Sequence, residues 1–348
     1  MKSLLSHTTD ELREAFGSAG LPAYRAGLAR GERYFARMTD LPERLRGELA
    51  ELWSTRSLST RAVHTAADGT RKLELSTADG GVLEAVLIPE RGRRTLCVSS
   101  QIGCSLDCAF CATGRLGLGR NLDAAEIVDQ VLVACDLLRA AGESVTHVVY
   151  MGMGEPLLNW PQVMRSIRVL VDPDGPALSP RRITVSTAGV VSRLPKLAEA
   201  PPVGLAVSLH ATTDEVRDEL VPLNRRFPIA RLLEACAELD RLRSGRLTFE
   251  YTLIRDVNDS DEDARRLARL IRPLRAGINL IAMNEHPGAD YRRPDEARLN
   301  RFALLASSAG ARVTVRRSRG DDIYAACGQL ARLTPAPAVA PLSGAGAG

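Results

Sequence analysis

Between residues 95 and 283, short apolar runs alternate with longer amphipathic stretches. Runs rich in β-branched and apolar residues predict strands at 95–100, 146–151, 182–187, 203–209, 247–254 and 277–283. A period near 3.6 predicts helices after them, at 123–141, 160–171, 190–200, 229–243, 261–272 and 295–309. Strands that alternate with helices form a parallel sheet with the helices outside it. Because six such units are fewer than the eight of a closed barrel, we expect an α/β fold that is an open, partial (βα)6 barrel.

The two ends of the chain follow other patterns. Helical stretches are predicted from Thr8 to about Trp53, followed by short strands at 62–64, 72–76 and 83–89. A last strand is predicted at 311–316, and the Ala-, Pro-, Gly- and Ser-rich end is typical of a disordered tail. We therefore divide the chain into a small helical region with a short β extension over 1–82, a core over 83–331 and a tail over 332–348.

Composition narrows the class of protein. The 348 residues are 45% hydrophobic and 25% charged, which is typical of a soluble globular protein. No apolar run approaches the ~20 residues of a membrane span, and the first residues have no apolar core of signal-peptide length. Seven cysteines in a long chain argue against a secreted disulfide framework. We expect a cytoplasmic protein without membrane contact.

The net charge of +4 is mild, but arginines gather at two places. One cluster, within 91–94, stands before Cys97, and a second, within 312–319, stands before Cys327. Solvated surface charge would explain either cluster alone. Because both precede a cysteine, phosphate binding becomes the stronger hypothesis.

The residues with distinctive chemistry follow the predicted strands. In parallel α/β folds, active sites form at the carboxyl ends of the strands. Those positions hold Cys104–Cys111 after the first strand, Gly152–Pro156 after the second, Ser186 at the end of the third, His210 after the fourth and Asn284 after the sixth. We expect these residues to share one site.

Cys104, Cys108 and Cys111 form the pattern CxxxCxxC on one short loop. Iron–sulfur clusters are held by cysteine thiolates, normally four, so three leave one iron without a protein ligand. A catalytic metal needs such an open position, which the amino and carboxylate groups of S-adenosylmethionine could fill. The alternative is a structural zinc site with a distant fourth ligand, although zinc sites more often have two CxxC pairs and this chain has no second pair.

This motif, with Phe110 before the third cysteine, is the signature of the radical S-adenosylmethionine superfamily. The chain further resembles the RlmN/Cfr family of RNA methyltransferases over roughly residues 84–331. The resemblance rests on seven segments in the family's order: VSSQIGCSLDCAFCATG, MGMGEPLLN, RRITVSTAGV, VSLHA, PLNRRFPI, FEYTLIRDVNDSDEDA and SRGDDIYAACGQL. It implies a partial (βα)6 radical-SAM barrel, a [4Fe–4S] cluster on the three cysteines and S-adenosylmethionine as cofactor.

The resemblance also implies a reaction. RlmN methylates C-2 and Cfr methylates C-8 of adenine, ring carbons too weakly nucleophilic to attack a methylsulfonium. A methyl group is therefore first placed on a protein thiolate, the best nucleophile among side chains. By the resemblance this is Cys327; a second S-adenosylmethionine yields the radical that activates the methyl group, so each turnover uses two. Cys97 then resolves the protein–RNA adduct through a disulfide bond with Cys327, and Glu84 is the proton acceptor.

The remaining site residues are implied in the same way. They are Gly154 and Glu155 for the methionine amino group, Ser186, Ser208, Leu209 and His210 along the cofactor, and Asn284 near its adenosine. The motif MGMGEP resembles RlmN more than Cfr. The expected target is adenine C-2 in 23S rRNA, at the peptidyl transferase centre, and adenosine 37 of certain tRNAs. We further expect a monomer, RNA contact by the N-terminal region, and a reductant such as flavodoxin.

Two alternatives differ in their use of the cysteines. One is a Cfr-like C-8 methyltransferase; the other is a metal-stabilised RNA-binding protein without catalysis, which needs neither Cys97 nor Cys327. Two departures from the family pattern bear on the target. Residues 284–288 read Asn-Glu-His-Pro-Gly where relatives have Asn-Pro-Phe-Pro-Gly, and Tyr324 replaces an acidic residue.

Overall fold

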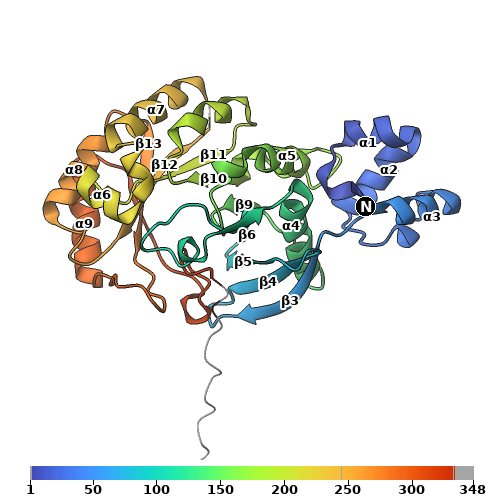
Figure 1. The fold of residues 1–348 in the computed structure, drawn as a ribbon, viewed down its shortest axis with the longest axis horizontal. Coiled ribbons are helices and arrows are strands. Elements are labelled where there is room, and N and C mark those ends of the chain that lie inside the picture. Colours follow the sequence, from blue (N-terminus) through green and yellow to red (C-terminus); the bar gives the residue numbers. More distant parts are fainter. Residues whose placement is uncertain (1, 244, 332, 334–348) are drawn as a thin grey trace, which may run out of the picture.

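A ten-stranded sheet forms the centre of the computed structural model, which describes residues 2–243, 245–331 and 333 (Figure 1). From one edge to the other its strands are β14 (Val313–Arg316), β13 (Ala276–Ala282), β12 (Leu247–Leu253), β11 (Gly204–Ser208), β10 (Ile183–Thr187), β9 (His147–Tyr150), β6 (Arg93–Cys97), β5 (Val82–Glu90), β4 (Arg71–Thr77) and β3 (Leu58–Thr65). Strands β6 and β9 to β14 are parallel. The open barrel and the mixed α/β class predicted from the sequence are confirmed.

Helices cover the outer face of the parallel strands (Figure 1). In the core they are α4 (Ala124–Arg139), α5 (Trp160–Val171), α6 (Asp214–Leu220), α7 (Ile229–Leu242), α8 (Asp261–Ile271) and α9 (Glu296–Ser308). The helix predicted at 190–200 is a 3₁₀ helix over Val191–Glu199 instead, and it contains Pro195. Proline has no N–H to donate and clashes with the preceding turn, which explains the departure from α geometry.

Helix starts follow from local sequence. At α4, the Asp123 carboxylate accepts from the backbone N–H of Glu126 at 2.8 Å, and the Glu126 carboxylate accepts from the N–H of Asp123 at 2.9 Å. This capping box satisfies two N–H groups that a helix end leaves unpaired. Ser260 and Asp295 cap α8 and α9 through side-chain oxygens.

The antiparallel strands β3 to β5 continue the barrel sheet rather than forming a sheet of their own. Strand β5 pairs with β4 on one side and with β6 on the other. The predicted division at residue 82 therefore falls between strands that are hydrogen-bonded to each other. As a statement about separate units, that division stays a prediction. The predicted tail, 332–348, lies outside the described residues except for Leu333.

The N-terminal helices α1 (Thr9–Phe16), α2 (Gly20–Tyr24) and α3 (Glu43–Leu52) lie to one side of the barrel (Figure 1). The segment Leu4–Ser6 before them contacts both α4 and α5. Asp129 of α4, fully buried, accepts from the backbone N–H groups of Ser57 and Leu58 at 2.6 and 2.8 Å and pairs with Arg33. Buried carboxylates are tolerated when such partners satisfy them. Asp129 thus fixes the N-terminal region to the core. Among the described residues, no helix has the length and apolar character needed to cross a membrane.

Candidate active site

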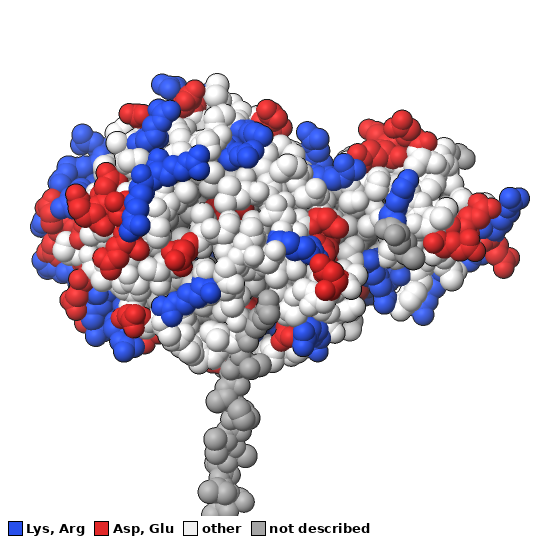
Figure 2. All heavy atoms as spheres, viewed as in Figure 1, with Lys and Arg blue, Asp and Glu red and all other residues white. Residues whose placement is uncertain are grey.

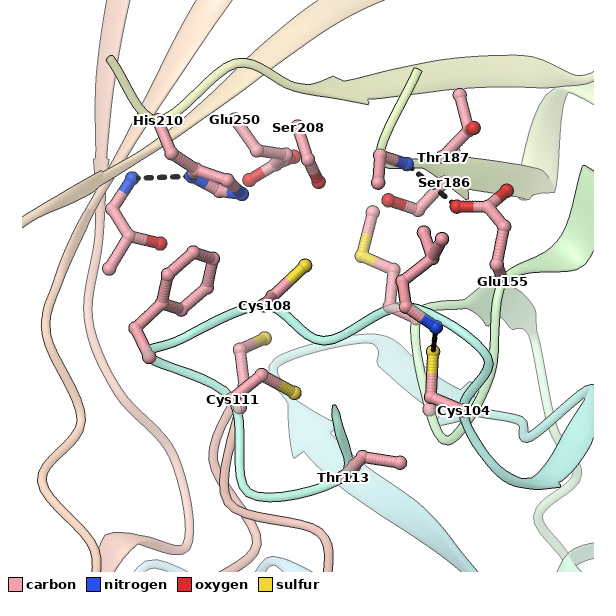
Figure 3. Close-up of a pocket in the computed structure, with 18 of the residues that line it drawn as sticks. Cys104, Cys108, Cys111, Thr113, Glu155, Ser186, Thr187, Ser208, His210 and Glu250 are labelled. Atoms are coloured by element: carbon pink, nitrogen blue, oxygen red, sulfur yellow. Dashed lines mark hydrogen bonds between the residues drawn. The ribbon is translucent and has the colours of Figure 1, made fainter. Parts of the chain in front are cut away.

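A cavity of about 970 Å³ opens at the carboxyl ends of the parallel strands (Figure 3). The predicted residues in its lining are Cys104, Cys108, Cys111, Gly154, Glu155, Ser186, Ser208, His210, Asn284 and Cys327. Most of the predicted site residues therefore lie around one cavity, as expected for residues that follow parallel strands. Figure 3 shows the cysteine loop on one wall, with Ser186, Ser208 and His210 on the wall opposite.

The cysteine loop is held by backbone contacts on both sides. It starts in the hairpin of β7 (Gln101–Gly103) and β8 (Leu118–Asn121), where Gly103 has a φ of +74° and an added Cβ would lie 1.9 Å from the Gly117 carbonyl oxygen. Only glycine fits there. Farther along, the N–H of Ala112 donates to the Gly328 carbonyl at 2.7 Å. The loop is thereby joined to the segment that carries Cys327.

The three thiols fit an iron–sulfur cluster. Burial raises the pKa of Cys104 to about 12 and that of Cys108 well above its ordinary value, so neither is stable as a bare thiolate. Binding to a cationic metal supplies the charge that ionises such thiols. Among the described residues, no three His, Cys, Asp or Glu side chains converge closely enough for a single ion. In a four-iron cluster each thiolate binds a different iron, and three thiols along one wall of a cavity with space beyond them suit that arrangement.

Glu155 is held rigidly across the cavity. Its carboxylate accepts from the backbone N–H groups of Ala188 at 2.7 Å and Leu157 at 3.0 Å, and its own N–H donates to Gln101 Oε1 at 2.9 Å. Burial raises its pKa to about 7. Gly154 before it has a φ of +99°, and an added Cβ would lie 2.5 Å from Gln101 Cβ. This carboxylate can meet an ammonium group without rearranging.

His210 is a neutral residue of the cavity wall. Its Nδ1 accepts from the Thr252 N–H at 3.0 Å, which leaves the ring proton on Nε2. Burial, followed by the charge of Arg217, lowers its pKa to about 3. The Phe110 ring meets the imidazole edge-on, with centroids 4.8 Å apart. The backbone of His210 is left-handed, with a φ of +58°, and this turn directs the side chain toward the cysteine loop.

Arg217, which the sequence analysis missed, joins the strand ends around the cavity. It is fully buried in α6 and donates to the carbonyls of Leu209 at 2.9 Å, Ala188 at 2.8 Å and Ser208 at 3.0 Å. It thereby fixes the spacing between the ends of β10 and β11. The segment DEVRDEL predicts a charged surface helix, and no local pattern indicates that its arginine is buried. The predicted Leu209 lies behind the wall and contributes this carbonyl.

We expect Arg217→Met to lower the stability of the protein strongly. Three buried carbonyls would lose their donor, at about 1–3 kcal/mol each, so the free energy of unfolding should fall by about 3 kcal/mol or more. Arg217→Lys keeps the charge but loses the planar guanidinium group, so its free energy of unfolding should lie between those of Arg217→Met and wild type. Thermal unfolding of anaerobically purified protein measures the change. Arg231→Met on α7, a 67% exposed side chain, is the matched control. Equal melting temperatures for Arg217→Met and wild type would contradict this role.

A second cavity, of about 690 Å³, adjoins the first. Cys97 and Cys327 both line it, and Cys111, Asn284 and Cys327 belong to both cavities. Asn284 Nδ2 donates to the Cys327 carbonyl at 3.0 Å. Burial raises the pKa of Cys97 to about 12. The Cys327 side chain is exposed, unlike that of Cys97.

All seven cysteines are free thiols, so nothing in the structure supports the predicted disulfide bond between Cys97 and Cys327. Glu84 lies outside the linings of both cavities. It is 1% exposed and pairs with Lys72 at 3.2 Å, and Lys72 also donates to the Leu333 carbonyl at 2.6 Å. Glu84 is thus a buried carboxylate of β5, and proton acceptance by Glu84 stays a prediction.

The two arginine clusters differ in what they contact. In the first, Arg94 is engaged by Glu143 and by neighbouring carbonyls. In the second, Arg316, Arg317 and Arg319 line the cavity of Cys97 and Cys327, whereas Arg312 stands before β14, at its opposite end. Arg312 therefore does not share a site with the other three arginines, because the length of β14 separates it from them.

Both departures from the family pattern lie beside these cavities. The ring nitrogens of His286 lie 3.2 Å from the Pro287 carbonyl and 3.3 Å from that of Phe110, next to a cluster cysteine. Tyr324 has a left-handed backbone, with a φ of +51°, in the segment before Cys327. Of residues 284–288, Asn284 lines both cavities.

Glu250 is a second residue of the cavity that sequence reasoning missed. It lies on β12, is 3% exposed, and accepts from Asn279 Nδ2 at 2.9 Å. Arg316 Nη1 lies 3.8 Å from the same oxygen. A carboxylate inside the apolar run LTFEYTLI was an available signal, because buried charges are rare and usually have a specific use.

Comparisons with known proteins point to one family of enzymes. Residues 98–268 match the family model described as the Radical SAM superfamily. The chain is 46% identical over 353 residues to the protein named Dual-specificity RNA methyltransferase RlmN of Jannaschia sp. (strain CCS1), covering 95% of this chain and 90% of that protein. A protein of the same name from Alkalilimnicola ehrlichii (strain ATCC BAA-1101 / DSM 17681 / MLHE-1) is 47% identical, covering 85% and 82%. The crystal structure of a radical SAM methyltransferase from Sphaerobacter thermophilus superposes with a TM-score of 0.91 at 43% identity, covering 95% and 99%.

Proposed function

Because the chain belongs to the RlmN family of radical S-adenosylmethionine RNA methyltransferases, we propose that it methylates C-2 of adenine in 23S rRNA, and adenosine 37 of certain tRNAs. The observation that carries the proposal is the position of Cys97 and Cys327. Both thiols line one cavity, and Cys327 also lines the adjoining cavity of the three cluster cysteines. A methyl carrier must reach both the methyl donor and the RNA base, and Cys327 stands where the two cavities meet.

In this proposal Cys327 carries the methyl group. Its sulfur attacks the methyl carbon of a first S-adenosylmethionine, so that a new S–CH₃ bond replaces the sulfonium–CH₃ bond, S-adenosylhomocysteine leaves and the thiol proton is lost. The [4Fe–4S] cluster, when bound, supplies the electron for reductive cleavage of a second S-adenosylmethionine. The methylated Cys327 would then lose one hydrogen atom, which ends on 5′-deoxyadenosine, the fragment released from the second S-adenosylmethionine, and its carbon would form a bond to the adenine ring. Cys97, in the same cavity, releases the product from Cys327.

The other cavity residues position the cofactor. Glu155 has an aligned carboxylate for the methionine ammonium, and Gly154 keeps the approach to it open. Ser186, Ser208 and His210, which also face the cysteine loop, would supply polar atoms to the rest of the cofactor. Asn284 contributes near the adenosine while its amide holds the Cys327 carbonyl at 3.0 Å. Proton acceptance from the adenine is assigned to Glu84.

The cellular setting follows from the substrate. Ribosomal and transfer RNA are cytoplasmic, so we place the protein there, as a monomer. A one-electron reductant such as flavodoxin is required for each reductive cleavage.

Mass spectrometry of nucleosides tests the proposal. A strain lacking the gene should lose 2-methyladenosine from 23S rRNA, and the gene returned on a plasmid should restore it. Loss of 8-methyladenosine instead would establish a Cfr-like target, and an unchanged nucleoside profile would overturn the proposal. Digests of purified tRNA report separately on position 37.

We expect Arg317→Gln to weaken RNA binding without affecting methylation of Cys327. Arg317 is exposed and lines the cavity of the two cysteines, so it is placed to hold a phosphate beside the target base. Loss of one phosphate contact should reduce the slope of log affinity against log salt by about one. Arg312→Gln, at the other end of the same strand, is the matched control. If both variants bind like wild type, Arg317 is an ordinary surface charge.

A further inference from the structure

An exposed tyrosine stands between two arginines in the N-terminal region. Tyr34 is 47% exposed. The guanidinium carbon of Arg37 lies 5.0 Å from the centre of its ring, and that of Arg56 lies 4.2 Å from it. We call Tyr34, Arg37 and Arg56 the tyrosine site. The ring is therefore open to solvent and has two guanidinium groups beside it.

The two arginines have charge available for a ligand. The nearby Arg30 and Arg33 are paired with carboxylates, Asp40 and Asp129 respectively. Within the part of the chain that the structure describes, neither Arg37 nor Arg56 has a carboxylate partner. Both are exposed. Their contact with the ring contributes about 0.5–1 kcal/mol each at such a site, which an anion can outweigh.

The tyrosine site is connected to the active site by one strand. Arg56 comes two residues before β3, the outermost strand of the large sheet. The turn after β3 contacts the segment of Cys327, where the N–H of Ala67 donates to Asp322 Oδ2 at 3.0 Å. Figure 1 shows β3 running along the sheet edge from the N-terminal helices to that segment. Eight residues of strand span about 26 Å at ~3.3 Å each.

The face of the molecule drawn in Figure 2 has no large patch of one charge. In Figure 2, positive and negative side chains are interspersed over the visible surface rather than gathered by sign. The net charge of the chain is +4. A polyanion would therefore be bound by local groups, and RNA is the polyanion that this enzyme uses.

We propose that the tyrosine site is a second contact for the substrate RNA, at the opposite end of β3 from the segment that carries Cys327. An unpaired base stacks on the Tyr34 ring, while Arg37 and Arg56 bind the phosphates on either side of it. Aromatic stacking accepts any base, and guanidinium groups suit phosphate oxygens. The inference rests on the proposed function and adds where the enzyme holds RNA away from the target. It distinguishes RNA with a suitably placed single-stranded segment from RNA that has only the target loop.

Binding and kinetics of three variants test this inference. The probe is a fluorescein-labelled transcript of the 23S rRNA peptidyl transferase region, titrated with purified protein at several salt concentrations. Tyr34→Ala should weaken binding about 10-fold, the loss of one stacked base, whereas Tyr34→Phe keeps the ring and should stay within about twofold of wild type. Arg37→Gln combined with Arg56→Gln should reduce the salt slope by about one to two. Arg44→Gln, a 91% exposed arginine of the same region, is the control.

The readouts separate this inference from the proposed function. Tyr34→Ala should raise KM for the transcript while kcat at saturating RNA and methylation of Cys327 stay at the wild-type level. If wild type methylates the transcript and Tyr34→Ala binds it equally well, the tyrosine site is not an RNA contact. If wild type methylates no adenine in the transcript, the proposed function fails instead. Equal melting temperatures for Tyr34→Ala and wild type exclude loss of folding as the cause.

Discussion

The Cys97→Ala protein is expected to remain covalently attached to its RNA through Cys327. In the proposed sequence of steps Cys327 acts first, as methyl carrier, and Cys97 acts last. Without Cys97 the chemistry should proceed to the protein–RNA adduct and stop, with less than about one methylated RNA per enzyme. A denaturing gel with labelled RNA detects the adduct, and mass spectrometry after nuclease digestion locates it on Cys327.

Two further variants serve as controls for this experiment. Cys327→Ala should yield neither methylated protein nor methylated RNA, because the first acceptor is missing. Cys236→Ala removes a buried cysteine of α7 that lines neither cavity, and it should turn over like wild type. A purely structural role for Cys97 predicts lost stability and no adduct. Full turnover by a folded, cluster-bearing Cys97→Ala protein would disprove the releasing role and leave the radical chemistry intact.

Cys108→Ala should abolish the brown colour of anaerobically purified protein and the cleavage of S-adenosylmethionine. Three thiols hold the cluster, and Cys108 is a buried one whose pKa is raised well above its ordinary value. Loss of residues that only support metal ligands typically costs 10–100-fold, so loss of a ligand should reduce formation of 5′-deoxyadenosine by more than about 100-fold. Iron analysis, absorption spectra and product assay measure these effects.

The matched control is Cys135→Ala, a partly buried cysteine on α4 that lines neither cavity. It should keep both cluster and cleavage. Wild-type cleavage by the Cys108→Ala protein would disprove the ligand assignment. A colourless wild-type protein containing zinc would support the alternative of a structural metal site.

The barrel could be predicted because its signals are local. Buried parallel strands are continuous apolar runs, and the helices between them carry one apolar face, so a window of a few residues identifies each element. The α-helix predicted at 190–200 is a 3₁₀ helix instead, because Pro195 is compatible with the apolar periodicity but not with α-helical geometry. The gathering of Cys104, Glu155 and His210 also followed from the sequence, since all stand after parallel strands.

What the sequence could not reveal depends on distant partners. The sequence did not indicate that the Glu84 carboxylate is buried and pairs with Lys72 on the neighbouring strand. Arg94 was expected to bind phosphate, but Glu143, 49 residues away, engages it. Arg217 was overlooked because its acceptors lie on other strands. In each case the residue could be recognised as charged from the sequence. The direction of its side chain and the identity of its partner depend on tertiary packing.

The continuity of the sheet from β14 to β3 has a consequence for how such an enzyme can change over evolution. A protein that lost its first 82 residues would expose the hydrogen-bonding edge of β5, a long and largely apolar strand. Open edges of this kind invite pairing with other chains and aggregation. The N-terminal region therefore caps the sheet as well as extending it, and its loss would have to be compensated by another strand or a covering loop. Sequence drift is expected to be easier in its exposed helices than in β3 and β4, whose backbones close that edge.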